Sequence, residues 1–254
     1  MEDQEYQELY HIEEQHWWFR GNRQVAFGLL EKYRSKLGGY AVLDAGCGTG
    51  LNMIQLNPWG TVTGIDISPR AVGFCEKRGL KNVVLGPVER TPFPNHSFDI
   101  VTCFGVLYHK AVDDQRTMHE FSRICKPGGL VLITTPAMKF LRGNIFRTPH
   151  DELQHTGKRH SKKELYQLLA AAGFTVRTIS YYTTLLFLPV IFARLFGNVK
   201  RLLFTSAPKK SDLTLPPGWI GKLLEKTMAI EAAIIPTVSL PFGVGLVAVA
   251  EKKS

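Results

Sequence analysis

The sequence predicts an α/β fold built on a doubly wound, seven-stranded, mostly parallel sheet with helices on both faces. Three observations predict it. Short β-branched apolar runs alternate with helix-like segments along the chain, which is the pattern of parallel strands joined by crossovers. A glycine-rich loop follows the first run, and an acidic residue ends the second. At 254 residues and 44% hydrophobic content, the chain suits one core better than two independent domains.

The strands and two helix starts can be placed from local signals. Ser68 precedes Pro69, which places a capping hydroxyl before a proline at the first helical position. Ser161 and Glu164 have the spacing of a capping box, and Gly173 is placed to end that helix. We expect strands at residues 40–44, 61–66, 82–85, 98–104, 130–135, 174–181 and 245–250.

Charge and cysteine content limit the cellular compartments and the binding partners that suit this protein. A formal charge of +9 suits a nucleic acid, an anionic membrane surface or an acidic substrate, but it bears on association and not on fold. The N-terminal MEDQEYQELY lacks a basic, then apolar, signal peptide, and no apolar run reaches the roughly 18 residues of a membrane span. The sequence contains no CxxC pair, which argues against a zinc knuckle and against a disulfide framework. We therefore expect a cytoplasmic protein, at most peripheral at the membrane, with four separated cysteines: Cys47, Cys75, Cys103 and Cys125.

The glycine loop VLDAGCGTG, residues 42–50, should open onto the first helix at the carboxyl edge of the sheet, where α/β proteins bind ligands. Gly46, Gly48 and Gly50 let the backbone turn tightly and approach a ligand closely. A dinucleotide fingerprint would place its third glycine at 51, where this chain has Leu51. The spacing therefore specifies no clear pyrophosphate cradle.

Two carboxylates flank this loop. Asp66, about 20 positions beyond the first glycine, is placed to accept hydrogen bonds from both hydroxyls of a ribose. Asp44 would repel a pyrophosphate but favour a ligand with an ammonium or sulfonium group. Together they favour a cationic nucleoside, and S-adenosylmethionine is the cofactor that this combination indicates.

Four ordered motifs carry a family resemblance. The stretches VLDAGCGTG, VTGIDIS, PFPNHSFDIVTCFGVLYH and ICKPGGLVLITTP, within residues 42–136, resemble the motifs of Rossmann-like class I S-adenosylmethionine-dependent methyltransferases of the type 11 kind. The resemblance implies an antiparallel last strand, a methionine part over the glycine loop, a ribose held by Asp66, and S-adenosylhomocysteine as the product. The cofactor-binding residues it implies are Asp44, Gly46, Cys47, Gly48, Gly50, Asp66, Ile67, Val88, Glu89 and Phe104.

One motif departs from the family pattern. Many relatives have G-D-A-E-x-L-P-F after the third strand, with the aspartate on the adenine amino group. This chain reads GPVERTPF at 86–93 and has Pro87 at that position. We expect the Val88 backbone amide or the Glu89 side chain to take over this contact.

Segments outside these four motifs resemble a smaller group within the family. EQHWWFRGNR at 14–23, HDELQH at 150–155, KRH at 158–160 and LPFG at 240–243 are similar to a group of bacterial and archaeal methyltransferases with HWWF near the start. Such proteins are often encoded beside enzymes of glycan and lipid-glycan assembly. The resemblance implies a small-molecule, glycan or lipid-linked acceptor, methylated at an oxygen by in-line displacement.

An oxygen acceptor would need a general base. His109 follows the fourth strand on the ligand edge and titrates near neutral pH; the alternative is a helix cap or a backbone contact. Tyr108 is a candidate acceptor contact or a packing residue. A second polar cluster has three possible roles. It could supply a general base together with the carboxylate that orients it, it could form a lid that closes over the acceptor, or it could be a solvated loop. We expect no metal there because nothing fixes a ligand count. Its members are His150, Asp151, His155, Arg159 and His160.

The chain is expected to form one domain, 1–254, in four parts. Residues 1–36 form an N-terminal cap whose Trp17, Trp18 and Phe19 either seal the cofactor cleft or join the core, and Arg20 follows them as a further cap residue. Residues 37–182 form the core, and 241–254 the last strand and tail. Residues 183–240 form an inserted helical cap, whose apolar LLFLPVIFARLF and following basic residues suit a lipid-linked acceptor or an ordinary packed helix.

Two other classes of function stay open as alternatives. Base-amine nucleic-acid methyltransferases have [DNS]PP[YFW] after the fourth strand and cytosine-C5 enzymes a Pro-Cys nucleophile, whereas this chain reads TCFG at 102–105. Nucleic acid is therefore not the expected acceptor, although an RNA-modifying enzyme stays as an alternative. A non-catalytic scaffold that binds S-adenosylmethionine is the other, and the oligomeric state is left open.

Overall fold

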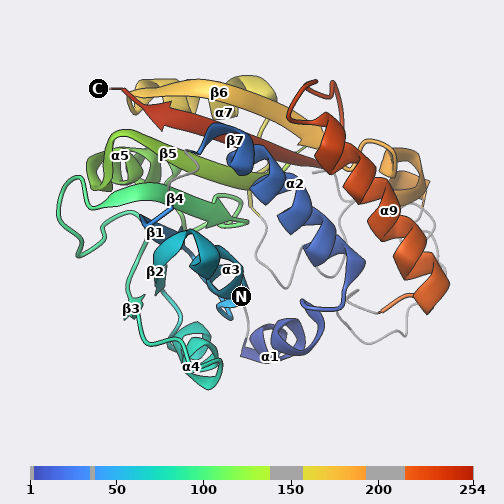
Figure 1. The fold of residues 1–254 in the computed structure, drawn as a ribbon, viewed down its shortest axis with the longest axis horizontal. Helices are drawn as coiled ribbons and strands as arrows, with labels where there is room; N and C mark the ends of the chain where they lie inside the picture. The colour runs from blue at the N-terminus through green and yellow to red at the C-terminus, as the bar shows by residue number, and fades with distance from the viewer. Residues whose placement is uncertain (1–2, 35–37, 138–156, 193–214, 254) are drawn as a thin grey trace.

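The computed structural model describes residues 3–34, 38–137, 157–192 and 215–253. Its seven strands form one sheet in the order β3-β2-β1-β4-β5-β7-β6, and β7 runs antiparallel to both of its neighbours (Figure 1). The predicted sheet is thus confirmed, including the reversed last strand. The strands are β1 Tyr40–Ala45, β2 Gly60–Asp66, β3 Val83–Leu85, β4 Phe98–Phe104, β5 Cys125–Pro136, β6 Phe174–Tyr182 and β7 Gly245–Lys252.

Local capping signals set two helix starts as predicted. The Ser68 hydroxyl accepts from the Ala71 amide, and Ser161 with Glu164 forms both hydrogen bonds of a capping box. Gly173 follows the second of these helices at φ +87°, the left-handed conformation that ends helices. The helices are α1 Asp3–Ile12, α2 Trp17–Tyr33, α3 Leu51–Leu56, α4 Pro69–Lys77, α5 Asp114–Ile124, α7 Lys162–Ala171 and α9 Gly218–Ile234.

Both faces of the sheet are buried. Successive strand residues point to opposite faces, so Val42 and Leu43 enter different hydrophobic clusters. Helices α5 and α7 cover the Leu43 face, and α2, α3 and α9 cover the Val42 face. This double covering explains why the central strands read as continuous apolar runs.

The long connection between β6 and β7 contains helix α9, while the predicted cap of residues 183–240 stays a prediction. Helix α9 lies along α2 on one face of the sheet (Figure 1). An ion pair of 3.0 Å joins Arg20 of α2 to Glu225 of α9, and the Leu185 amide donates to Glu231 of α9 over 2.7 Å. None of the helices in the described ranges is long and apolar enough to cross a bilayer.

Candidate active site

The glycine loop turns sharply between β1 and α3. Gly46 and Gly48 have φ of +76° and +54°, and the Gly46 amide donates to the Ile65 carbonyl over 2.7 Å. A Cβ added at Gly46 would lie 2.2 Å from the Val106 side chain, whereas one at Gly48 meets nothing within 4 Å. Packing therefore requires Gly46 to lack a side chain, while Gly48 borders open space where a ligand can approach the backbone.

Asp66 fixes this loop to the end of β2. Its Oδ2 accepts from the Gly48 amide and its Oδ1 from the Ser68 amide, each over 2.9 Å. Burial raises the pKa of Asp66, and the hydrogen bonds from Ser68 and Gly48 oppose that rise. Each carboxylate oxygen can accept a second hydrogen bond, so the side chain can also receive two ribose hydroxyls.

Asp44 is the least satisfied carboxylate of this region. It is fully buried, its Oδ1 accepts from the Thr102 hydroxyl over 2.8 Å, and its Oδ2 has no hydrogen-bond partner among the described residues. Burial raises the pKa of Asp44 to about 7 despite the Thr102 hydrogen bond. A buried carboxylate of this kind is stabilised by a cation placed beside it.

These features fit S-adenosylmethionine. Three features lie at the carboxyl edge of β1 and β2. They are the open side of Gly48, the Asp66 carboxylate that can accept from a ribose, and Oδ2 of Asp44, which has no hydrogen-bond partner among the described residues. Leu51, where a dinucleotide site would have a glycine, is buried in the structure. The site therefore suits a cationic nucleoside better than a pyrophosphate.

The N-terminal segment reaches this loop through residues that sequence reasoning missed. The Glu13 carboxylate accepts from the Thr49 hydroxyl, and from Arg78 Nη2 over 3.0 Å. Arg23 Nη2 donates to the Glu13 carbonyl over 2.7 Å. Tyr6 is buried, and its pKa is raised by that burial and by nearby Asp66. No spacing rule marks these residues, because their partners lie far away in sequence.

Removing the Glu13 carboxylate is expected to weaken S-adenosylmethionine binding. Glu13→Ala leaves the Thr49 hydroxyl and the buried Arg78 side chain without this acceptor, which we expect to loosen the loop and cost about tenfold in affinity. Titration calorimetry measures the change. Glu14→Ala is the matched control, because Glu14 also pairs with Arg78 but its side chain is 58% exposed. Equal losses in both variants would show that Glu13 has no special role.

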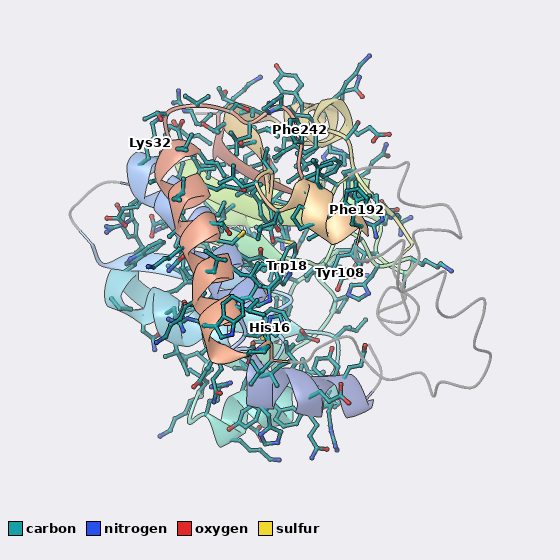
Figure 2. All side chains as sticks on the ribbon, turned by 90° about the vertical axis from the view of Figure 1, so that its right-hand side faces the viewer. His16, Trp18, Lys32, Tyr108, Phe192 and Phe242 are labelled. Carbon is teal, nitrogen blue, oxygen red and sulfur yellow. The ribbon has the colours of Figure 1, made fainter. Side chains whose placement is uncertain are left out.

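The predicted aromatic cap residues lie at the start of α2. His16 caps the helix by accepting from the Trp18 amide over 3.2 Å, and the Trp18 ring lies 6.4 Å from that of Tyr182. Trp17 packs against the core, and Arg20 is held by α9. Figure 2 shows His16, Trp18 and Tyr108 on the same side of the molecule. The acceptor contacts expected of Trp17, Trp18 and Arg20 stay predictions.

The loop after β4 meets the segment that leads into α7. His109 is half-buried, with its ring 4.3 Å from that of Tyr108. The Tyr108 carbonyl accepts from the amides of Gly157 and Lys158 over 2.8 and 3.0 Å. The structure thus joins the two polar clusters that the sequence singled out, although His150, Asp151 and His155 lie outside the described residues.

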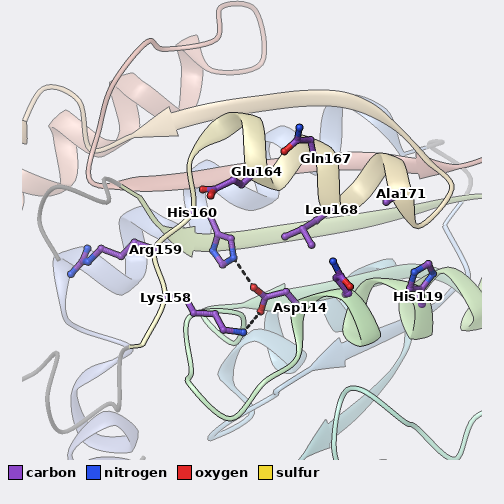
Figure 3. A pocket seen from close by; sticks show the side chains of 10 residues that line it. Asp114, His119, Lys158, Arg159, His160, Glu164, Gln167, Leu168 and Ala171 are labelled. Atoms are coloured by element: carbon purple, nitrogen blue, oxygen red, sulfur yellow. Dashed lines mark hydrogen bonds and ion pairs between the residues drawn. The ribbon is translucent and has the colours of Figure 1, made fainter.

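The described part of the second cluster forms a satisfied network. His160 Nε2 lies 3.0 Å from Asp114 Oδ2, its Nδ1 lies 3.1 Å from the Thr135 hydroxyl, and Lys158 donates to Asp114 over 2.9 Å (Figure 3). Burial raises the pKa of Asp114, but hydrogen bonds from His160 and Lys158 outweigh it and hold the pKa below its usual range. Arg159 points away and donates to the Ala137 carbonyl.

This network borders a cavity of about 570 Å³. Side chains of α5 and α7 line it together with the segment before α7. Within the described ranges, no three histidine, cysteine, aspartate or glutamate side chains gather closely enough to hold a metal ion. The hydrogen bonds of this network join the segment before α7 to Asp114 of α5 and Thr135 of β5.

Other predicted cofactor residues differ in their surroundings. The Cys47 sulfur is buried 3.9 Å from that of Cys75, and the Phe104 ring packs 5.4 Å from that of Phe27. Val88 is buried in the core, whereas Ile67 is 71% exposed beside Asp66. Glu89 accepts from the Asp113 amide over 3.2 Å. How adenine is held stays a prediction.

Comparison with known proteins links this geometry to methyl transfer. A family model described as a methyltransferase domain matches residues 43–133. A demethylmenaquinone methyltransferase of Staphylococcus aureus is 32% identical over 173 residues, covering 56% of this chain and 71% of that protein. A geranyl diphosphate C-methyltransferase of Streptomyces coelicolor, solved with S-adenosylhomocysteine, shares the fold with a TM-score of 0.56 and 18% identity, over 89% of this chain and 77% of that one.

Other relatives match over a smaller share of their length. A tRNA (carboxymethyluridine(34)-5-O)-methyltransferase of Arabidopsis thaliana is 35% identical over 98 residues, which are 38% of this chain and 24% of that protein. The chain spans 62% and 47% of the length of two further relatives. The names of these relatives state different acceptors, demethylmenaquinone in one and a tRNA uridine in another.

Proposed function

Because this chain belongs to the class I S-adenosylmethionine-dependent methyltransferases, we propose that it methylates a small-molecule, glycan or lipid-linked acceptor at an oxygen atom. The observation that carries the proposal is the buried Asp44 carboxylate, whose Oδ2 has no hydrogen-bond partner among the described residues, on the strand that leads into the loop of Gly48, with Asp66 fixed to that loop. This arrangement supports a site in which Asp44 would face a cationic donor and Asp66 would position its sugar.

The chain's own residues would act chiefly by positioning. S-adenosylmethionine supplies an electrophilic methyl group on a sulfonium centre. Asp66 would accept hydrogen bonds from the ribose, and Asp44 would face the positive charge. The N-terminal segment, through Glu13 and the buried Tyr6, lies against the glycine loop and would limit access of water. Holding two reactants in line can recover roughly 7 to 11 kcal/mol of a barrier, more than proton transfer supplies.

His109 would accept the proton of an acceptor hydroxyl. It lies on the loop after β4, at the edge where β1 and β4 also end. Aspartate and histidine residues outside the described ranges, Asp151 and His155, are the other candidates of the sequence. The role of His109 is supported by its place at this edge of the sheet.

Replacing His109 is expected to slow turnover without weakening donor binding. His109→Ala should lower kcat by about 100-fold, the low end of what a general base contributes, and should leave the affinity for S-adenosylmethionine unchanged. The wild-type pH–rate profile should rise through the pKa of the catalytic base, and the variant should lose this limb. An unchanged profile and kcat would assign His109 to packing against Tyr108.

One observation favours a second function. The similarity to a tRNA methyltransferase and the formal charge of +9 both suit an RNA acceptor. The similarity covers only 24% of that tRNA methyltransferase, however, and a basic charge equally suits an anionic lipid surface.

A labelled-methyl transfer assay tests the acceptor class. The protein is incubated with radiolabelled S-adenosylmethionine and separate pools of glycans, lipid-linked glycans, small hydroxylated molecules and RNA. Label in a base-labile or ether-linked methyl group of the first three pools supports the proposal. Label confined to RNA would establish the second function instead, and no transfer to any pool would favour a non-catalytic protein.

A further inference from the structure

Helix α9 is apolar on two opposite sides. Met228 and Ile235 on its inner side are buried against the core. The opposite side carries Trp219, Leu223 and Ile230, which are 72%, 56% and 51% exposed. These residues and Ile234 recur at helical spacing, so they form one continuous line on the outer surface. Exposed apolar side chains gathered on one side of a helix make that side a candidate surface for a binding partner.

Two lysines run along the same side. Lys222 and Lys226 are exposed, and their spacing places them next to the apolar line. The acidic residues of α9 face elsewhere, since Glu225 pairs with Arg20 and Glu231 is buried. We call this surface the α9 stripe, and it consists of Trp219, Lys222, Leu223, Lys226, Ile230 and Ile234.

The segment after β6 packs against the buried side of α9 and carries further exposed apolar residues. The Leu185 amide and the Thr183 hydroxyl bond to Glu231 and Met228 of α9, over 2.7 and 3.6 Å. Further along the same segment, Leu188 and Phe192 are 61% and 64% exposed. Figure 2 shows Phe192 and α9 on the side of the molecule that also carries Trp18 and Tyr108. Phe192, Trp18 and Tyr108 thus lie on one side of the molecule, the side that Figure 2 turns toward the viewer.

We propose that the α9 stripe, with Leu188 and Phe192, docks onto the surface of an anionic lipid bilayer. The inference rests on the proposed function, because it selects the lipid-linked acceptor among the proposed classes. Tryptophan, phenylalanine and leucine on one side with flanking lysines is the composition of interfacial helices that lie in the headgroup region. Lipid phosphates would pair with Lys222 and Lys226 while the apolar side chains enter the acyl boundary.

Charge separates a bilayer from a second copy of the chain. In a two-fold contact between two α9 stripes, the same surface meets itself, so Lys222 and Lys226 would approach their own copies. The stripe offers no carboxylate to pair with them, and burying unpaired like charges is unfavourable. Anionic headgroups supply the missing negative charge, in keeping with the formal charge of +9.

Vesicle co-sedimentation of the full chain tests the proposal without any acceptor. Vesicles of phosphatidylcholine mixed with phosphatidylglycerol should bind the wild-type protein, and vesicles of phosphatidylcholine alone should bind it much less. Lys222→Glu with Lys226→Glu should weaken binding by about fivefold or more for each lysine. Trp219→Ala with Ile230→Ser should also release the protein. Lys81→Glu with Lys253→Glu, at exposed positions elsewhere, makes the same change in net charge and should have little effect.

The outcomes are distinct. Equal losses in the α9 and control charge variants would overturn the proposal, because binding would then follow net charge alone. A dimer in light scattering that becomes a monomer in Trp219→Ala with Ile230→Ser, without vesicle binding by the wild type, would assign the stripe to a second copy. Unchanged S-adenosylmethionine affinity shows that each variant is folded. Vesicle binding without methylation of any lipid-linked acceptor would reject the acceptor class and leave the docking surface standing.

Discussion

Asp66→Ala is expected to weaken S-adenosylmethionine binding by about 1,000-fold. Hydrogen bonds to a charged group are worth about 1.5 to 3 kcal/mol each, so two ribose contacts account for about 4 kcal/mol. The variant also frees the Gly48 and Ser68 amides that Asp66 now binds over 2.9 Å. The loop would lose order together with its ligand.

Titration calorimetry with donor and product measures this effect. S-adenosylhomocysteine carries the same ribose, so both affinities should fall by a similar factor. Asp99→Ala is a suitable control, since Asp99 accepts from the Ala41 amide and pairs with Lys126 at the opposite end of the strands from the glycine loop. Retained affinity in Asp66→Ala, with a folded protein, would contradict the assignment of Asp66 to the ribose.

Asp44→Asn is expected to raise the free energy of unfolding at neutral and higher pH. The folded pKa of Asp44 is about 7, above the ordinary value of 3.8, so the folded state binds this proton more tightly than the unfolded chain. Stability from this group is present below about pH 4 and is lost as pH rises to about 7. The loss amounts to about 4 kcal/mol. Urea unfolding at about pH 4 and about pH 8 should show a gap between variant and wild type only at the higher pH.

The same substitution should change ligand preference. The asparagine side chain cannot carry a negative charge, so the variant should lose the preference for the cationic donor over its neutral product while keeping affinity for the product. If Asp44→Asn is no more stable than the wild type at about pH 8 and still prefers the donor over the product, Asp44 is not a destabilising buried charge that favours the cationic donor.

Local sequence signals were enough to predict most of the sheet. All seven strands were expected, because apolar runs between turn residues mark buried strands regardless of their partners. The start of β5 was missed: the strand begins at Cys125, ahead of the expected residue 130. The stretch between them contains Pro127, Gly128 and Gly129, which read as a turn, but Cys125 pairs with Phe98 and Lys126 binds Asp99.

The candidate site likewise contains residues that the sequence could predict and residues that it could not. Gly46, Gly48 and Asp66 lie within short motifs whose spacing carries the geometry, and the structure brings them together. The contacts of Glu13 with Thr49 and Arg78 depend on how the chain after α1 returns to the loop, so no local pattern marks them. The exposed side of α9 was equally hidden, because sequence hydrophobicity alone does not tell which apolar side faces the core.

Calorimetric titration with S-adenosylmethionine, S-adenosylhomocysteine and a nicotinamide dinucleotide tests the central claim most directly. The arrangement of Asp44, Gly48 and Asp66 predicts that the first two bind, that the cationic donor binds more tightly at about pH 8 than at about pH 5, and that the dinucleotide gives no heat. Clear binding of the dinucleotide, with none of either sulfur nucleoside, would contradict it.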